Sequence, residues 1–460
     1  MGFARPSDAV RHLTACALDG EPLQRVATAC AEAPDPDLAA AQVCRWIAIT
    51  GRVPSREFLA RLAAVLGLST SLGAFLSRHP EQAELLRDGS ALAKPRTRKG
   101  LADAAVRALH TDEDPRIALR IFKRRELLRV ACRDLAGGVS VEEVGRELAF
   151  LAEAALRAAL VSLEEELPAP QGARFCVVGM GKLGGEELNY SSDIDVMFVF
   201  DAASGSEARA VEWASRVAEG VLSRLAATTE EGQAFRVDAS LRPEGKDGPL
   251  VRSLASFRAY YERWAKPWEF QALIKARPVA GDLVLGREFS DLVRPFVYPE
   301  RLSAEAIREI RSMKARIEKE RIGPREDPRF QMKVGSGGTI DIDFTIQLVQ
   351  ATYGHRDPRL QAQGTIPAIS AAAEMGLIDL QKGRWLADGY RFLNRVRNVL
   401  YLVKGRPQDS LPSEAEEQET LARALGYPAP GARVQLLEDY RKATRRVRQV
   451  CEDVFYGGAS

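Results

Sequence analysis

The sequence predicts an α+β fold that is mostly helical, in which a small mixed sheet lies between two helical regions. Residues 1–165 are rich in Ala, Leu, Arg and Glu and show helical spacing of apolar residues. Short runs typical of strands follow between about residues 175 and 242, and helical spacing returns from about residue 300. Because 460 residues are too many for one ordinary core, we expect three domains: helical (1–165), α/β (166–300) and helical (301–460).

The helical regions are predicted from the spacing of apolar residues and from breaks in it. The spacing is clear in 58–66 and 141–163, and the basic run 94–100 separates them as a loop. Proline and glycine in 168–172 mark the first domain boundary. The C-terminal region contains further runs with helical spacing: 304–321, 340–353, 366–375, 383–404 and 434–455.

Three segments are predicted to be strands. Residues 175–178 form a short apolar run that ends in glycines, and 194–200 form a second apolar run. Residues 234–242 alternate between apolar and polar side chains, as in a strand with one buried face, and Pro243 ends the run. Helical spacing in 206–226 places a helix between the second and third strands.

Composition excludes several classes of protein. A net charge of +2 implies no strong attraction to nucleic acid or to an anionic membrane. No run of 18 apolar residues exists, so we expect no membrane-spanning helix. The N-terminus lacks the apolar core of a signal peptide, so we expect no such peptide either. The six cysteines include no CxxC pair, and the four histidines form no HExxH motif. We therefore expect reduced cysteines, a cytoplasmic location and no histidine-built zinc site.

Three carboxylates form the central candidate site. Asp193 and Asp195 project from the same face of a strand because side chains alternate along it. Asp238 lies on the polar face of the third strand and joins them if the two strands are neighbours. Each pair of charges about 5 Å apart would repel by roughly 3 kcal/mol at an effective dielectric of about 20. A divalent cation removes this repulsion, so the cluster predicts Mg²⁺ or Mn²⁺.

Glycines and basic residues near these carboxylates indicate a nucleotide polyphosphate. Glycines allow a backbone to approach phosphate, and Lys or Arg neutralises phosphate oxygens. The predicted nucleotide-binding residues are Gly181, Lys182, Gly184, Ser192, Arg242 and Lys246. Taken singly, an Asp-X-Asp pair is more often a solvated strand end, and each basic residue is more often an ordinary surface charge. The prediction depends on the glycines, the aspartates and the basic residues occurring together.

The glycines also match a dinucleotide-binding fingerprint, which we reject. Gly179-x-Gly181-x-x-Gly184 fits the pattern, and Asp201 follows at about the expected distance. A βαβ unit, however, needs a full helix between its strands. Only eight residues separate Gly185 from Ile194, and they include a turn sequence.

The run from Gly179 to Asp195 closely resembles the nucleotidyltransferase motif of glutamine synthetase adenylyltransferase, a family in the polymerase-β-like superfamily. Other segments resemble the same family in the same order, and together they cover most of residues 60–455: 124–134, 236–245 with 248–251, 260–264, 267–277, 333–338 with Asp341 and Asp343, and 396–400. The family enzyme carries two such units, of which one adds AMP to glutamine synthetase and the other removes it. This chain resembles one unit.

The resemblance implies transfer of AMP from ATP to a tyrosine of glutamine synthetase, with Asp193, Asp195 and Asp238 as catalytic metal ligands. It names glutamine synthetase and ATP as partners and PII as a further candidate, although a single unit lacks the family's interdomain arrangement. Two alternatives stay open: phosphorolytic removal of AMP, and a catalytically silent regulatory unit. Asp343 stands where the family usually has Glu, so its role is open. Residues 335–338 form either a turn that approaches phosphate or the entry to a helix with Thr339 as N-cap.

Overall fold

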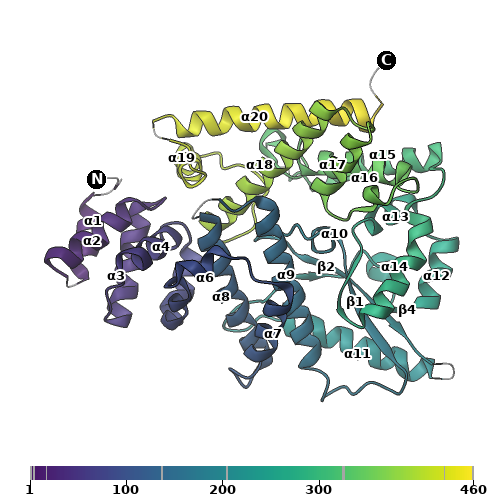
Figure 1. Ribbon diagram of the computed structural model, residues 1–460, viewed down its shortest axis with the longest axis horizontal. Coiled ribbons are helices and arrows are strands. Elements are labelled where there is room, and N and C mark those ends of the chain that lie inside the picture. Colours follow the sequence, from purple (N-terminus) through teal and green to yellow (C-terminus); the bar gives the residue numbers. More distant parts are fainter. Residues whose placement is uncertain are drawn as a thin grey trace.

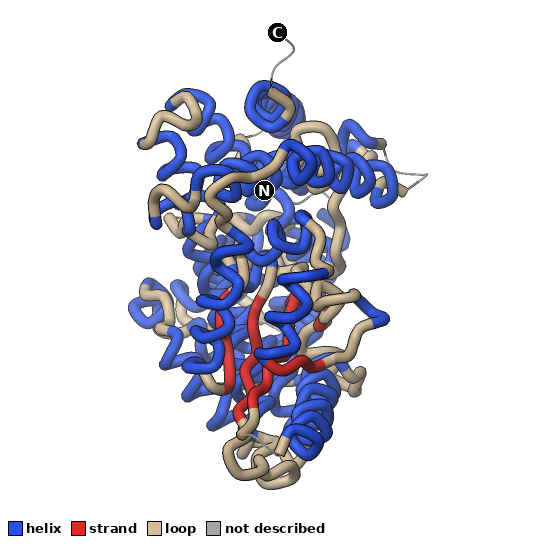
Figure 2. Tube along the Cα trace, turned by 90° about the vertical axis from the view of Figure 1, so that its right-hand side faces the viewer, coloured by secondary structure: helices blue, strands red, loops and turns tan. Residues whose placement is uncertain are grey.

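The structure, a computed structural model, describes residues 3, 6–16, 18–135, 138–203, 206–323, 327–428 and 430–457. Within these residues the predicted fold class is confirmed: a small mixed sheet lies among many helices (Figure 1). Figure 2 shows the strands gathered together, with helices around them and a separate layer of helices at the top. Met1, Gly2, Ala4 and Arg5, on which the expectation about the N-terminus partly rests, lie outside the described residues.

The N-terminal region is helical, as predicted. Several of its helices begin at a residue whose side chain accepts a backbone N–H of the first turn, as Asp35, Ser55 and Ser140 do. Such caps satisfy donors that would otherwise lack partners. The elements are α1 (Pro6–Ala15), α2 (Gly20–Ala31), α3 (Pro36–Thr50), α4 (Arg56–Leu66), α5 (Thr70–Arg78), η1 (Pro80–Leu86), α6 (Gly89–Ala93), α7 (Arg98–Ala108), α8 (Pro115–Leu135) and α9 (Val141–Val161).

One expectation about this region is wrong. Cys16, at the end of α1, and Cys44, in α3, form a disulfide, although we expected all six cysteines to be reduced. Their separation of 28 residues carries no recognisable pairing signal, because packing of α1 on α3 brings them together. The other four cysteines are free and buried.

The sheet has five strands in the order β3-β2-β1-β5, with β4 also paired to β2. β1 is antiparallel to β2 and β5, and β2 is parallel to both β3 and β4, so the sheet is mixed as predicted. The strands are β1 (Arg174–Gly179), β2 (Ile194–Asp201), β3 (Val237–Asp238), β4 (Val251–Ser253) and β5 (Arg277–Gly281).

The predicted third strand, 234–242, is mostly wrong, because only two of its residues are in a strand. Two short strands share one edge of β2: β3 pairs with Ile194 and Asp195, and β4 pairs with Phe198 to Phe200. The chain therefore leaves the sheet after Asp238, turns, and returns as β4. Neither β4 nor β5 was predicted from the sequence.

Helices cover both faces of the sheet. Alternate residues of β1 and β2 enter two apolar clusters: Val177 and Phe198 pack with residues of α9 and α11 (Glu207–Ala226), whereas Val178 and Met197 pack with α12 to α14. The remaining elements here are α10 (Gly181–Gly184), η2 (Gly245–Asp247), α12 (Leu254–Arg263), α13 (Pro267–Leu273) and α14 (Leu283–Val297).

The C-terminal region is helical, as predicted, and its longest helix, α18, packs against α20. One apolar cluster contains residues from all three parts of the chain, so the division into three domains stays a prediction. The elements are α15 (Ala304–Arg321), η3 (Pro328–Phe330), α16 (Thr339–Tyr353), η4 (Pro358–Gln361), α17 (Thr365–Glu374), α18 (Leu380–Lys404), α19 (Ala415–Ala424), α20 (Ala432–Val450) and η5 (Cys451–Phe455), a short π-helical turn.

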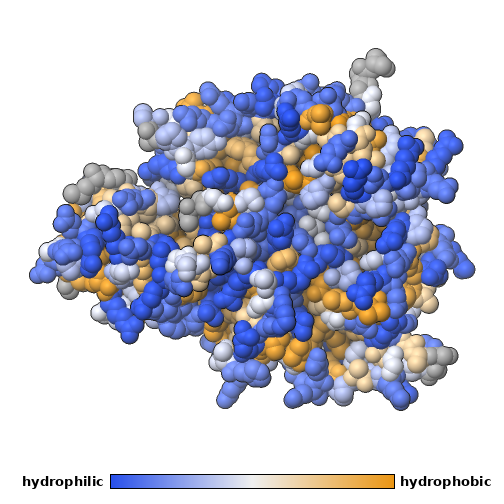
Figure 3. Space-filling view, in the orientation of Figure 1, coloured by the Kyte–Doolittle hydropathy of each residue, from blue (hydrophilic) through white to orange (hydrophobic). Residues whose placement is uncertain are grey.

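The surface in Figure 3 is mainly hydrophilic, with apolar side chains in scattered patches rather than one continuous band. Within the described ranges, none of the helices combines the length and apolar composition that crossing a membrane requires.

Candidate active site

The glycine turn after β1 lies directly against a carboxylate. Gly181 has a φ of +50°, a conformation that favours glycine, and a Cβ at this position would lie 2.7 Å from Oδ2 of Asp195. The Met180 N–H donates to the Asp195 carbonyl at 2.8 Å, which fixes the turn beside the start of β2. The turn therefore has no space for a side chain where it meets Asp195.

Asp195 and Asp238 are neighbours, as the sequence predicted. They are directly paired residues of the parallel strands β2 and β3. Burial and, to a smaller extent, the charges of Asp238 and Asp193 together raise the pKa of Asp195 to about 7. Asp238 also accepts the Ser240 N–H at 2.7 Å, which orients its carboxylate. The smaller contribution, from the neighbouring carboxylates, has the sign of the charge repulsion that the sequence predicts for the cluster.

Asp193 is held differently from the other two carboxylates. It forms an ion pair with Arg236, and its side chain is 46% exposed. In the part of the chain that the structure describes, no three acidic, histidine or cysteine side chains are already arranged to hold a metal ion. The metal role of the three aspartates thus stays a prediction, in which Asp193 would have to exchange Arg236 for the cation.

Two cations that were not selected from the sequence lie near enough to Asp195 for their charges to affect its pKa. Lys333 and Arg321 each lower the pKa of Asp195 by their charge, although burial dominates. Burial also lowers the pKa of Lys333, while nearby Asp409 acts in the opposite direction. Arg321 ends α15 and Lys333 lies just before α16, so both come from the C-terminal region. The only sequence signal was the segment 333–338, in which we noted the glycines rather than the lysine.

Lys182 does not point into this carboxylate cluster. Its amine donates to the side-chain oxygens of Asn189 and Asn394, which joins the glycine turn to α18. Burial lowers its pKa well below the ordinary value, and Arg397 adds to this effect. Its predicted contact with phosphate is untested, and in the observed arrangement two of its three N–H donors already have partners.

The other predicted nucleotide-binding residues lie around the turn that follows β3. Arg242 donates to the carbonyls of Gly248 and Ala239 at 3.1 and 2.8 Å, and to that of Lys246 at 3.0 Å, so its guanidinium holds the turn together. The Lys246 side chain is exposed. Arg242 therefore shapes the loop that presents Lys246.

Ser192 and Gly184 have structural contacts of their own. The Ser192 hydroxyl accepts the Asn189 N–H at 3.0 Å, within the loop before β2. A Cβ on Gly184 would lie 1.6 Å from the Lys275 carbonyl oxygen, so close packing alone requires glycine there. Their nucleotide-binding role stays a prediction.

The structure assigns ion pairs to Asp341 and Asp343, whose roles were left open. Asp343 accepts a hydrogen bond from the Lys275 amine at 3.0 Å. Asp341 is buried, pairs with Lys314, and accepts the Gly337 N–H at 2.8 Å. Asp341 therefore fixes the segment that carries Lys333, whereas Asp343 fixes α16 to Lys275. The helix-entry interpretation was nearly correct: α16 begins at Thr339, but Gly338 is the N-cap.

The candidate site is thus a set of carboxylates on two paired strands of a small mixed sheet, beside a glycine turn. Residues 59–291 match the family model for glutamate-ammonia ligase adenylyltransferase, and 308–455 match that for GlnD PII-uridylyltransferase. The chain is 37% identical to a bifunctional glutamine synthetase adenylyltransferase/adenylyl-removing enzyme of Streptomyces avermitilis, over 99% of this chain and 49% of that protein. Proteins of the same name from Mycobacterium avium and Mycobacterium leprae are 38% and 41% identical, over 99% and 86% of this chain and 48% and 40% of theirs.

The chain belongs to the glutamate-ammonia ligase adenylyltransferase family. It spans about half the length of the curated relatives it matches.

Proposed function

We propose that this chain transfers AMP from ATP to a tyrosine hydroxyl of glutamine synthetase and so regulates nitrogen assimilation. The observation that carries the proposal is the pairing of Asp195 with Asp238 beside the Gly181 turn, in a chain of this family. Two half-buried carboxylates that repel each other are unfavourable unless a cation neutralises them, and this arrangement suits a metal–nucleotide complex.

The predicted cation is Mg²⁺ or Mn²⁺, held by Asp195 and Asp238 with Asp193. The fit rests on the pKa of Asp195, which burial and the neighbouring carboxylates raise to about 7. Oxygen-only ligands suit these hard cations. When bound, such an ion supplies positive charge that stabilises phosphate oxygens.

The chain's own residues supply the remaining parts. The charges of Lys333 and Arg321 act on Asp195, and positive charge near the carboxylates suits the phosphates of ATP. In the reaction, the tyrosine oxygen forms a bond to the α-phosphorus, the bond from that phosphorus to the bridging oxygen breaks, and pyrophosphate leaves. The tyrosine proton passes to a carboxylate oxygen of Asp238.

The reverse-direction enzyme is the second candidate, because the relatives' name includes adenylyl removal and the chain matches about half their length. In that reaction, a phosphate oxygen attacks the phosphorus of tyrosine-bound AMP, ADP leaves, and the tyrosine oxygen regains its proton.

PII is a further proposed partner, supported by the match of 308–455 to a model named for PII-uridylyltransferase. The proposed substrates place the reaction in the cytoplasm.

Two incubations test the proposal. The protein is mixed with α-labelled ATP, Mg²⁺ and unmodified glutamine synthetase, and separately with labelled, adenylylated glutamine synthetase and phosphate. We expect label to enter glutamine synthetase in the first incubation. Release of labelled ADP in the second alone would instead assign the removing activity.

A matched pair of variants identifies the site. Asp195→Asn should abolish transfer, whereas Asp247→Asn, which alters an exposed acid in the loop after β3, should retain it. Full transfer by Asp195→Asn would refute the assignment of this carboxylate.

A further inference from the structure

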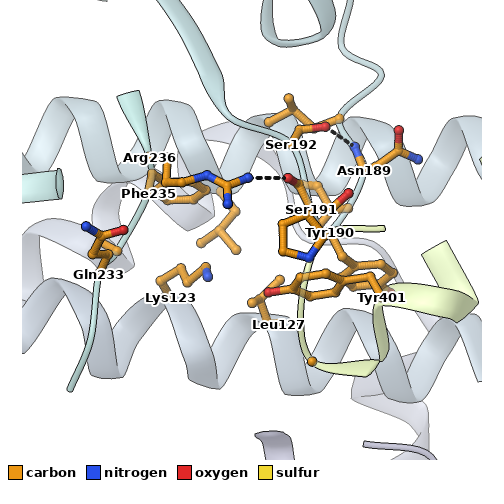
Figure 4. Close-up of a pocket in the computed structure, with 16 residues that line it drawn as sticks. Lys123, Leu127, Asn189, Tyr190, Ser191, Ser192, Gln233, Phe235, Arg236 and Tyr401 are labelled. Carbon is orange, nitrogen blue, oxygen red and sulfur yellow. Dashed lines mark hydrogen bonds between the residues drawn. The ribbon is translucent and has the colours of Figure 1, made fainter. Parts of the chain in front are cut away.

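A cavity of about 240 Å³ lies beside the proposed active site, on the side of Arg236. Its volume corresponds to roughly eight water molecules, which is enough for a small organic compound. It is lined by α8, α9, the loop before β2, residues 233–236 and the end of α18 (Figure 4). The cavity therefore lies where all three parts of the chain meet.

The charges in this cavity are all of one sign. Its lining includes the cations Lys123 and Arg236 but no Asp or Glu side chain. The rest of the lining is uncharged and includes three aromatic rings. Tyr190 is stacked on Tyr401, with 6.3 Å between the ring centroids, and Phe235 is the third. A site of this composition attracts a negative charge joined to an apolar body.

Lys123 is the unusual residue in this cavity. Among the described residues, its amine makes no hydrogen bond or ion pair, and it lies over the Phe235 ring, 5.5 Å from the amine to the centroid. Burial lowers its pKa to about 8, and Arg124 and Arg236 add to this effect. Figure 4 shows the amine between Arg236 and the Tyr401 ring.

The two most deeply buried lysines among the described residues have carboxylate partners. Lys275 pairs with Glu187 and Asp343, and Lys314 pairs with Asp341 and Glu318. A buried ammonium without a partner is unfavourable, and an isolated cation–π contact compensates for only about 0.5–2 kcal/mol. The missing partner of Lys123 is therefore what a bound anion would supply.

Arg236 connects this cavity to the carboxylate centre. It lines the cavity, forms an ion pair with Asp193, and donates to the Ser191 carbonyl at 3.1 Å. An anion beside Lys123 would compete with Asp193 for this guanidinium. Releasing Asp193 from Arg236 would leave it free to bind a cation.

We propose that this cavity binds a small organic anion, one carboxylate or phosphate group on an apolar body, whose binding acts on Asp193 through Arg236. The binding site stands on the cavity and Lys123 alone. The effect on Asp193 rests on the proposed function, because it takes Asp193 as a metal ligand. Such coupling is reciprocal, so Mg²⁺ and the anion strengthen each other's binding.

Calorimetric titration of the full chain tests the binding. The probes are benzoate and phenyl phosphate, which separate the two anionic groups, with benzyl alcohol as the neutral counterpart. We expect one or both anions to bind, and Lys123→Met to weaken binding at least tenfold. Arg125→Met, at an exposed position on the same helix, should bind as the wild type does. Failure of both anions to bind, or equal binding by Lys123→Met, would overturn the proposal.

Two further measurements keep the test independent of folding and of the enzymatic reaction. Acylation of the wild-type protein, mapped by mass spectrometry, should show Lys123 protected by the anions and not by benzyl alcohol; equal modification would count against the site. Mg²⁺ titrations should show tighter binding when the anion is present. An unchanged Mg²⁺ affinity would overturn the coupling through Arg236, whereas loss of AMP transfer alone would bear only on the proposed function.

Discussion

The strongest quantitative prediction concerns Asp195→Asn and the pH dependence of stability in the absence of metal. The pKa of Asp195 rises from an ordinary 3.8 to about 7 in the folded protein. As pH increases between these values, the unfolded chain loses its proton while the folded chain keeps it, so wild-type stability falls. At about 1.4 kcal/mol per pH unit, the loss amounts to about 4 kcal/mol by pH 8. Asparagine does not titrate, so the stability of the variant lacks this loss.

Denaturant unfolding with chelator, from pH 4 to pH 8, measures this difference. Asp195→Asn should match the wild type near pH 4, apart from a constant offset, and become progressively more stable than it toward pH 8. Asp247→Asn, with an exposed acid, should follow the wild-type profile. Adding Mg²⁺ at pH 8 should stabilise the wild type and not Asp195→Asn. Parallel stability profiles for the wild type and Asp195→Asn would refute the reasoning.

Three other changes give separate outcomes. Lys333→Met should reduce AMP transfer by about 100-fold or more, since a preorganised charge is lost from the carboxylate centre; transfer within a few-fold of wild type would exclude Lys333 from it. Gly181→Ala should impair Mg²⁺ binding as well as stability, whereas Gly376→Ala, with a φ of +70° and open space around it, should cause backbone strain alone; equal effects in both would contradict the close contact at Gly181. Replacing Cys16 with Ser should lower the free energy of unfolding by about 2–4 kcal/mol through loss of its bond to Cys44, and an unchanged unfolding midpoint under oxidising conditions would argue against the disulfide.

Features set by neighbouring residues were predicted well from the sequence. The helix expected at 340–353 is α16 (Thr339–Tyr353), and the helix expected at 383–404 lies within α18 (Leu380–Lys404). The proximity of Asp238 to Asp195 was also correct, although the long strand that suggested it was not. Alternation in 234–242 is equally compatible with a two-residue strand and a turn, since pairing partners decide how far a strand extends.

Features set by distant residues were not predictable in this way. Lys333 comes near enough to Asp195 to act on its pKa because tertiary contacts fix the segment before α16, including the bond from the Met332 N–H to the Asp409 carbonyl at 2.7 Å. Likewise, the pairing of Arg236 with Asp193 depends on the loop before β2 lying beside β3. A lysine in a glycine-rich segment carries no local signal of the strand it will face.

The carboxylate centre depends on both sides of the proposed domain boundary near residue 300. Lys275, just before β5, donates to Glu187 beside the glycine turn at 2.6 Å, to Asp343 in α16 at 3.0 Å, and to Thr365 in α17 at 2.9 Å. Its carbonyl packs so closely on Gly184 that no side chain fits between them. One buried amine thus joins the turn that contacts the carboxylates to the helices that position the opposing cations. Asp343, despite its short side chain, completes this link, and the helical region after residue 300 is therefore part of the site.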